Sequence, residues 1–118
     1  MQYVAKATLP WLRIRPHSVY AMGGSMGGQE TLLLVGRRPQ LVAGAVAFDS
    51  VTDFFRRYAD FAVLGRKGTM LQGLARVEVG GTPASNPRAY HQRSPQHWAA
   101  EIARSGVPLQ IWWSDAAE

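Results

Sequence analysis

Apolar residues fall along the chain in segments that alternate between strand and helix patterns. A short strand is expected over 19–22, and a helix that Pro39 closes is expected over 29–38. The nearly unbroken apolar run of 41–48 is typical of a strand buried on both faces of a sheet. A further strand is expected over 109–113. This alternation predicts an α/β fold with a mainly parallel sheet flanked by helices.

The chain after the 41–48 strand reads as mostly helical. Residues 51–64 carry aromatic side chains at a spacing that forms one apolar stripe, which is more typical of a core than of a binding site. A turn is expected at 65–68, a helix over 69–79 and a loop over 80–87. The aromatic stripe consists of Phe54, Tyr58 and Phe61.

A third helical segment over 96–104 is expected to begin with Ser94 as its N-cap. Residues 54–94 therefore form an excursion between two strands, and we expect it to be a helical, cap-like insertion. Before the first strand, 2–13 can form a helix, which Pro16 ends.

The most specific motif is Gly23-Gly-Ser-Met-Gly-Gly28, between the first strand and the next helix. Its G-x-S-x-G spacing is that of a nucleophile elbow, in which a serine on a strained turn exposes its hydroxyl above the sheet edge. Gly23 and Gly27 would let strand and helix pass without clashing side chains. The backbone N–H of Met26 would be one oxyanion donor, helped by the positive potential of the helix N-terminus. The motif predicts Ser25 as a nucleophile.

A glycine-rich turn before a helix can also bind phosphate, but neither phosphate fingerprint fits. From Gly23 the second position is Ser25, so the dinucleotide pattern G-x-G-x-x-G fails. A P-loop would need Lys and Ser or Thr after Gly28, where the chain has Gln29 and Glu30. An ordinary strand-to-helix turn with an unreactive serine stays open as the alternative.

Composition favours one modest domain, since 118 residues with 47% hydrophobic content can bury one small core. Thirteen Lys and Arg against eight Asp and Glu give a net charge of +5, but the basic residues are scattered and no nucleic-acid partner is expected. The absence of cysteine excludes disulfides and thiolate metal sites and suits a cytosolic protein. No signal peptide or bilayer-spanning run is recognised, so no membrane partner is expected.

Four segments, taken in order, resemble a known family: Tyr20-Ala-Met-Gly-Gly-Ser-Met-Gly-Gly28, Val51-Thr-Asp53, Arg93-Ser-Pro95 and Gly106-Val-Pro-Leu109. The chain resembles the α/β-hydrolase superfamily, and within it catalytic domains of the prolyl oligopeptidase and dienelactone-hydrolase type. The resemblance implies a serine hydrolase that cleaves an ester or peptide bond through an acyl-serine, without cofactor or metal. It does not separate a small-molecule ester substrate from a peptide.

In that family the acid follows the strand that corresponds here to 109–113, which carries the role to Asp115, with Glu118 as the next choice. The family's histidine comes after another strand and helix. His17, His91 and His97 all lie in the wrong order for it. We therefore expect residues 1–118 to be part of a catalytic domain that lacks its base and its upstream oxyanion loop, and to be inactive alone. A non-catalytic remnant or binding module is the alternative, and the oligomeric state stays open.

Two further groups of residues have a competing structural role. Trp98, Trp112 and Trp113 could line an acyl pocket, but packing under the cap is the preferred interpretation. Asp49 and Asp53 follow a strand at the edge where ligands gather in open α/β sheets. For Asp53 we expect a carboxylate that braces its loop rather than a member of the catalytic triad.

Overall fold

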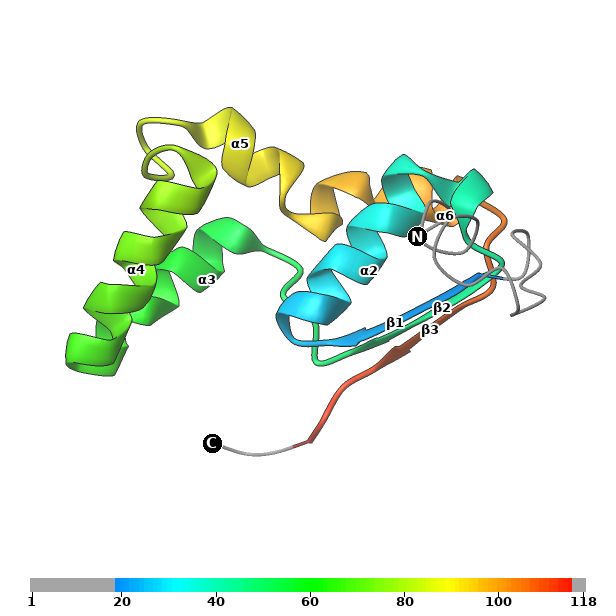
Figure 1. The fold of residues 1–118 in the computed structure, drawn as a ribbon, viewed down its shortest axis with the longest axis horizontal. Helices are drawn as coiled ribbons and strands as arrows, with labels where there is room; N and C mark the ends of the chain where they lie inside the picture. The colour runs from blue at the N-terminus through cyan, green and yellow to red at the C-terminus, as the bar shows by residue number, and fades with distance from the viewer. Residues whose placement is uncertain (1–18, 116–118) are drawn as a thin grey trace, which may run out of the picture.

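A three-stranded parallel sheet organises the chain in the computed structural model, which describes residues 19–115. The strands are β1 (Tyr20–Gly24), β2 (Gly44–Phe48) and β3 (Leu109–Trp112), in the spatial order β1-β2-β3 (Figure 1). Ala21 pairs with Ala45, which pairs with Leu109. The predicted parallel α/β architecture is confirmed. The helix expected over 2–13 lies outside the described residues.

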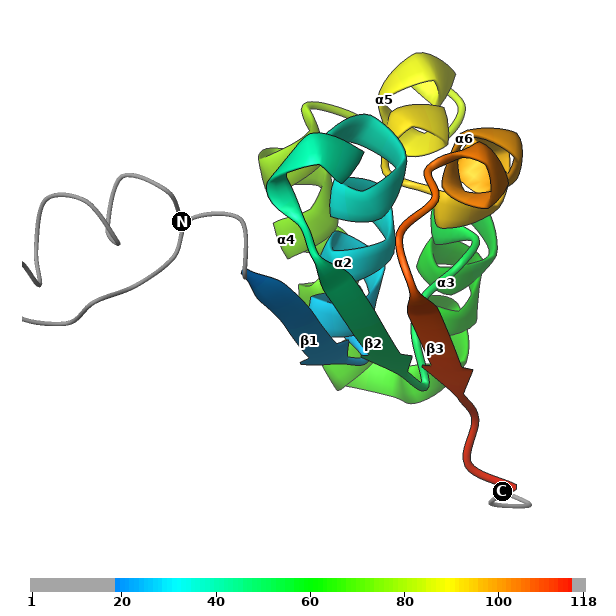
Figure 2. The same cartoon turned by 90° about the vertical axis from the view of Figure 1, so that its right-hand side faces the viewer.

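Helix α2 (Met26–Arg37) packs on one face of this sheet, against β1 and β2, and α6 (Ala99–Arg104) packs beside α2 on the same side (Figure 2). They approach each other closely at Gly36, where an added Cβ would press on Trp98 and Ile102. The core between sheet and helices is formed by buried Ala21, Val35, Val42 and Ala45, with Leu34, Leu41, Ile102, Val107 and Leu109 packed against them.

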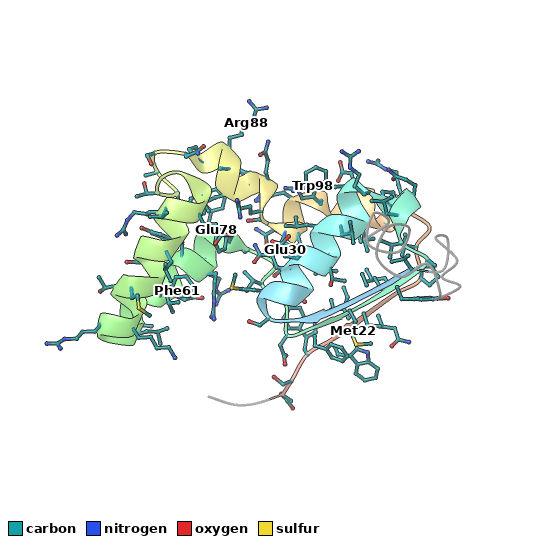
Figure 3. All side chains as sticks on the ribbon, viewed as in Figure 1. Met22, Glu30, Phe61, Glu78, Arg88 and Trp98 are labelled. Atoms are coloured by element: carbon teal, nitrogen blue, oxygen red, sulfur yellow. The ribbon has the colours of Figure 1, made fainter. Side chains whose placement is uncertain are left out.

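No helix among residues 19–115 covers the other face of the sheet (Figures 1 and 2). Tyr20 and Met22 point from that face and are 70% and 72% exposed; Figure 3 shows Met22 on the side opposite α2. The prediction that 41–48 is one strand buried on both faces is wrong on two counts. A 3-10 turn, η2 (Pro39–Leu41), precedes the shorter β2, and Phe48 is exposed.

The excursion between β2 and η4 (Pro95–Trp98) is helical, and it extends beyond the carboxyl ends of the strands (Figure 1). It contains α3 (Phe54–Asp60), η3 (Phe61–Leu64), α4 (Gly65–Val79) and α5 (Pro87–Gln92).

Two expectations for this stretch are corrected. The helix over 51–64 begins later and becomes a 3-10 turn, and 65–68 is the first turn of α4. Glycine is required at Gly68, because an added Cβ would overlap the carbonyl of Phe61. The loop expected over 80–87 ends at Pro87, where α5 begins.

Tyr90 is the centre of the excursion's own core and is completely buried. Its ring stacks on Phe54 with centroids 5.2 Å apart, and Tyr58 meets it edge-on at 5.7 Å. Its hydroxyl donates to the carbonyl of Gly81 at 3.0 Å. Burial, with a smaller contribution from Tyr58, raises the pKa of Tyr90 above the usual tyrosine value. The aromatic stripe thus forms a core, as the sequence predicted.

The two ends of the excursion are tied together. The N–H of Gln96 donates to the carbonyl of Thr52 at 3.0 Å. Buried Ser94 accepts from the N–H of Phe54 at 2.9 Å and donates to the carbonyl of Tyr90 at 2.8 Å. The predicted helix over 96–104 is instead η4 followed by α6, and the hydroxyl of Ser94 does not cap it. The hydroxyl of Ser94 instead accepts a hydrogen bond from the first residue of α3.

Candidate active site

Ser25 occupies the sharp turn between β1 and α2, with backbone angles φ 53° and ψ −115°. A non-glycine residue in this region is strained by about 1–3 kcal/mol and is held there by its surroundings. The N–H of Ser25 donates to the carbonyl of Phe48 at 2.9 Å, and its carbonyl accepts from Gln29 at 3.1 Å and from Val51 at 3.4 Å. The residue is exposed, so its hydroxyl is presented to solvent at the end of the sheet.

The glycines around Ser25 have unequal roles. A Cβ at Gly23 would overlap the backbone of Gly27, so strand and helix pass too closely there for any side chain. At Gly27 itself a Cβ would meet no atom within 4 Å. The second steric requirement lies at Gly28, where a Cβ would overlap the hydroxyl of Ser50. The strand therefore does approach the backbone of Gly27, but the second position that requires glycine is Gly28.

Met26 is the first residue of α2, so its N–H lies ahead of the helix's own hydrogen-bond ladder. No acidic side chain occupies the first turn of this helix. The positive end of the helix dipole is therefore uncompensated next to Ser25. This arrangement suits the oxyanion donor expected of Met26, whose role stays a prediction.

Two cavities meet at Ser25. The first, of about 330 Å³, is polar. The second, of about 210 Å³, is mostly apolar and is lined in part by α4. Ser25, Val51 and Arg57 line both. Other residues of the polar cavity are Asp49, Ser50, Thr52, Asp53, Arg56, Asp60 and Trp113, and those of the apolar cavity are Met26, Phe54, Phe61, Leu71, Leu74, Ala75 and Glu78.

Two carboxylates of the polar cavity are engaged with backbone. Asp53 caps α3, accepting from the N–H groups of Phe55 at 3.0 Å and Arg56 at 3.2 Å. Asp49, at φ 41°, accepts from the N–H of Ser114 at 2.5 Å. These contacts agree with the bracing role expected for Asp53.

The acids carried over from the family are not brought to Ser25 in the described residues. Asp115 is exposed beyond β3 and lines neither cavity that contains Ser25. Glu118 lies outside the described residues. The triad role of either residue stays a prediction.

His91 and His97 lie together, with ring centroids 4.0 Å apart, and Phe55 meets His91 edge-on at 5.0 Å. Both are exposed, and neither lines a cavity that contains Ser25. His17 lies outside the described residues. Nowhere in 19–115 do three or more His, Asp or Glu side chains gather into a group that could hold a metal.

Trp112 and Trp113 do not pack under the helical excursion, so that prediction is wrong for these two residues. Trp98 contacts the excursion, since its indole N–H donates to the carbonyl of Gln92 in α5 at 3.2 Å. Trp113 lines the polar cavity and is 60% exposed. Trp112 is exposed at the end of β3, where its indole N–H donates to Gln110. Trp98 packs below the guanidinium of Arg37, which lies 5.1 Å from the ring centroid.

Sequence reasoning missed two residues of this site. Arg57 has the spacing of the apolar stripe, since it lies three residues after Phe54 and four before Phe61, and that spacing could have placed it in the cavity wall. Ser50 is buried with an unpaired hydroxyl, but its contact with Gly28 joins distant segments and leaves no local signal.

A comparison with protein families matches residues 2–111 to the prolyl oligopeptidase family. Comparisons with curated proteins and with solved structures found no significant match. Within 19–115, no helix has the length and apolar character needed to cross a bilayer. The parallel sheet and its helices represent part of an α/β-hydrolase fold. Since the match spans nearly the whole chain, we conclude that this protein belongs to the prolyl oligopeptidase family.

Proposed function

We propose that this chain carries the nucleophile of a serine hydrolase, Ser25, and cleaves an ester or peptide bond through an acyl-serine intermediate. The observation that carries the proposal is the position of Ser25, on a strained and exposed turn where two cavities meet. Membership of the prolyl oligopeptidase family supports the same chemistry.

In this mechanism the Ser25 oxygen forms a bond to the substrate carbonyl carbon as its proton passes to a base. The negative charge that develops on the carbonyl oxygen is stabilised by the N–H of Met26 and the α2 dipole. The bond to the leaving alcohol or amine then breaks, and the base returns the proton to it. Water cleaves the acyl-serine in the same way and restores Ser25.

The base is proposed to be a histidine from outside 19–115, because the described histidines line neither cavity. Asp115 is the proposed acid, followed by Glu118. The apolar cavity next to Ser25 would hold the acyl side of a small-molecule ester or peptide.

The test uses the longest natural polypeptide that contains this sequence, with a 4-nitrophenyl ester as substrate and a fluorophosphonate as covalent probe. Ser25→Ala should lower kcat/KM at least about a thousandfold and abolish labelling. Ser105→Ala, at a serine that lines neither cavity with Ser25, should keep both. Turnover or labelling that persists in Ser25→Ala would exclude Ser25 as the nucleophile.

A second candidate is a non-catalytic binding module that has kept the elbow as a packing device. The absence of a described histidine from the cavities of Ser25 favours it. It predicts that small molecules bind the cavities with equal affinity in the wild type and in Ser25→Ala, without labelling in either.

A further inference from the structure

Among residues 19–115, Arg57 alone brings a free positive charge to the apolar cavity beside Ser25. It lies on α3, one turn after Phe54, and lines both cavities that contain Ser25. Its guanidinium carbon is 5.1 Å from the centre of the Phe61 ring, whose side chain is buried in the same wall. This cation–π contact holds the charge over apolar surface at the edge of the cavity.

No carboxylate within residues 19–115 forms an ion pair with Arg57. Glu78 is the only other charged residue in the described lining of the apolar cavity. Its carboxylate lies 3.1 Å from Arg93 and is thereby compensated. Figure 3 shows Phe61 and Glu78 on the helices of the excursion.

Three described carboxylates line the polar cavity together with Arg57, but none of them forms an ion pair with it. Asp53 accepts from two N–H groups of α3, and Asp49 accepts from Ser114. Asp60 also faces this cavity, together with Arg56. Neither Asp60 nor any other described acid is within ion-pair distance of Arg57.

We propose that Arg57 selects substrates whose acyl group has an apolar stem and ends in a carboxylate. The stem would lie along Phe54 and Phe61, and the carboxylate would take the fork of N–H donors on Arg57 that no described acid occupies. The inference rests on the proposed function, and it adds a substrate class to it.

The experiment compares two esters of equal shape, the mono-4-nitrophenyl ester of glutaric acid and that of its monoamide, in the longest natural polypeptide. We expect the wild type to prefer the carboxylate ester by about tenfold in kcat/KM, as one charge-assisted hydrogen bond allows. Arg57→Gln should abolish that preference and leave the amide ester within about threefold. The matched control Arg56→Gln, on the neighbouring residue that lines only the polar cavity, should keep the preference. An equal preference in the wild type and Arg57→Gln would overturn the inference.

A binding measurement separates this inference from the reaction itself. Hexanoate should bind the wild type and Ser25→Ala alike in calorimetric titrations, and about tenfold more weakly to Arg57→Gln. If no ester is hydrolysed but hexanoate binding depends on Arg57, the proposed reaction is wrong and the anion site stands. Hexanoate binding that is absent, or equal in the wild type and Arg57→Gln, would refute the anion site.

Discussion

The hydroxyl of Ser50 lies against Gly28, in the space that a Cβ at position 28 would fill. Both residues are buried. Their contact joins the first turn of α2 to the loop that follows β2. It therefore fixes the turn of Ser25 from the side of the neighbouring strand, in addition to the hydrogen bond between Ser25 and Phe48.

Gly28→Ala should destabilise the fold by about 1–3 kcal/mol, because the new methyl group overpacks against Ser50. Gly27→Ala is the matched control: its methyl group meets open space, and alanine in a helix is neutral or favourable by up to about 1 kcal/mol. Urea denaturation compares the two. Adding Ser50→Gly should rescue Gly28→Ala in part. Equal midpoints for the two alanine variants would contradict the packing described for Gly28.

The backbone strain at Ser25 predicts an unusual order of stabilities. Ser25→Gly should be more stable than Ser25→Ala by about 1 kcal/mol, because glycine adopts φ 53° without a Cβ clash. Ser105, at φ −62°, is the control. There the alanine variant should be the more stable by about 0.5–1 kcal/mol. If thermal unfolding shows the alanine variant to be the more stable at both positions, the turn at Ser25 is unstrained.

Asp53→Ala should cost about 1 kcal/mol of folding stability, because α3 loses the acceptor for two N–H groups. Asp53→Asn should cost only a few tenths of a kcal/mol, since asparagine is an equally good N-cap. Asp60, which precedes η3 without a side-chain cap, provides the control variant Asp60→Ala. Lost turnover with unchanged stability in both Asp53 variants would indicate a catalytic carboxylate instead.

The raised pKa of Tyr90 predicts alkaline destabilisation. Burial disfavours the phenolate, so the stability that this group contributes is fully present below about pH 10 and is lost as the pH rises through the folded-state pKa. Near pH 8, Tyr90→Phe should be less stable by about 0.5–1.5 kcal/mol, since the bond to Gly81 is lost. The difference from the wild type should narrow above about pH 10. A constant difference up to about pH 11 would show that folding does not raise the pKa of Tyr90.

The positions of the strands along the chain and the tight turn at Ser25 could be predicted because their signals are local. The apolar runs and the Gly23–Gly28 motif lie within a few residues of the features they determine. The boundaries of the helices inside the excursion could not be predicted, because long-range packing decides them. Gly68 looks like a turn residue in sequence, but it lies inside α4, where the close carbonyl of Phe61 leaves no room for a Cβ.

The sequence also could not predict whether helices cover one face of the sheet or both. The run of 41–48 contains apolar residues at both parities, so its pattern cannot tell a covered face from an exposed one. Trp112 and Trp113 likewise carry no local sign of exposure. In the site, the helical spacing of Arg57 from Phe54 and Phe61 could be recognised in the sequence. The contact between Ser50 and Gly28 could not, because only the fold brings these two segments together.

The bonds that join Thr52 to Gln96 and Phe54 to Ser94 mean that the helical excursion leaves and re-enters the sheet layer at adjacent points. Such a segment is modular: its contents can be exchanged while its two attachment points stay in place. A short turn between residues 54 and 94, or the corresponding segment of another family member, could therefore be grafted there without moving β2 or β3. The shape of the cavities beside Ser25 could in this way be redesigned separately from the turn that carries this residue.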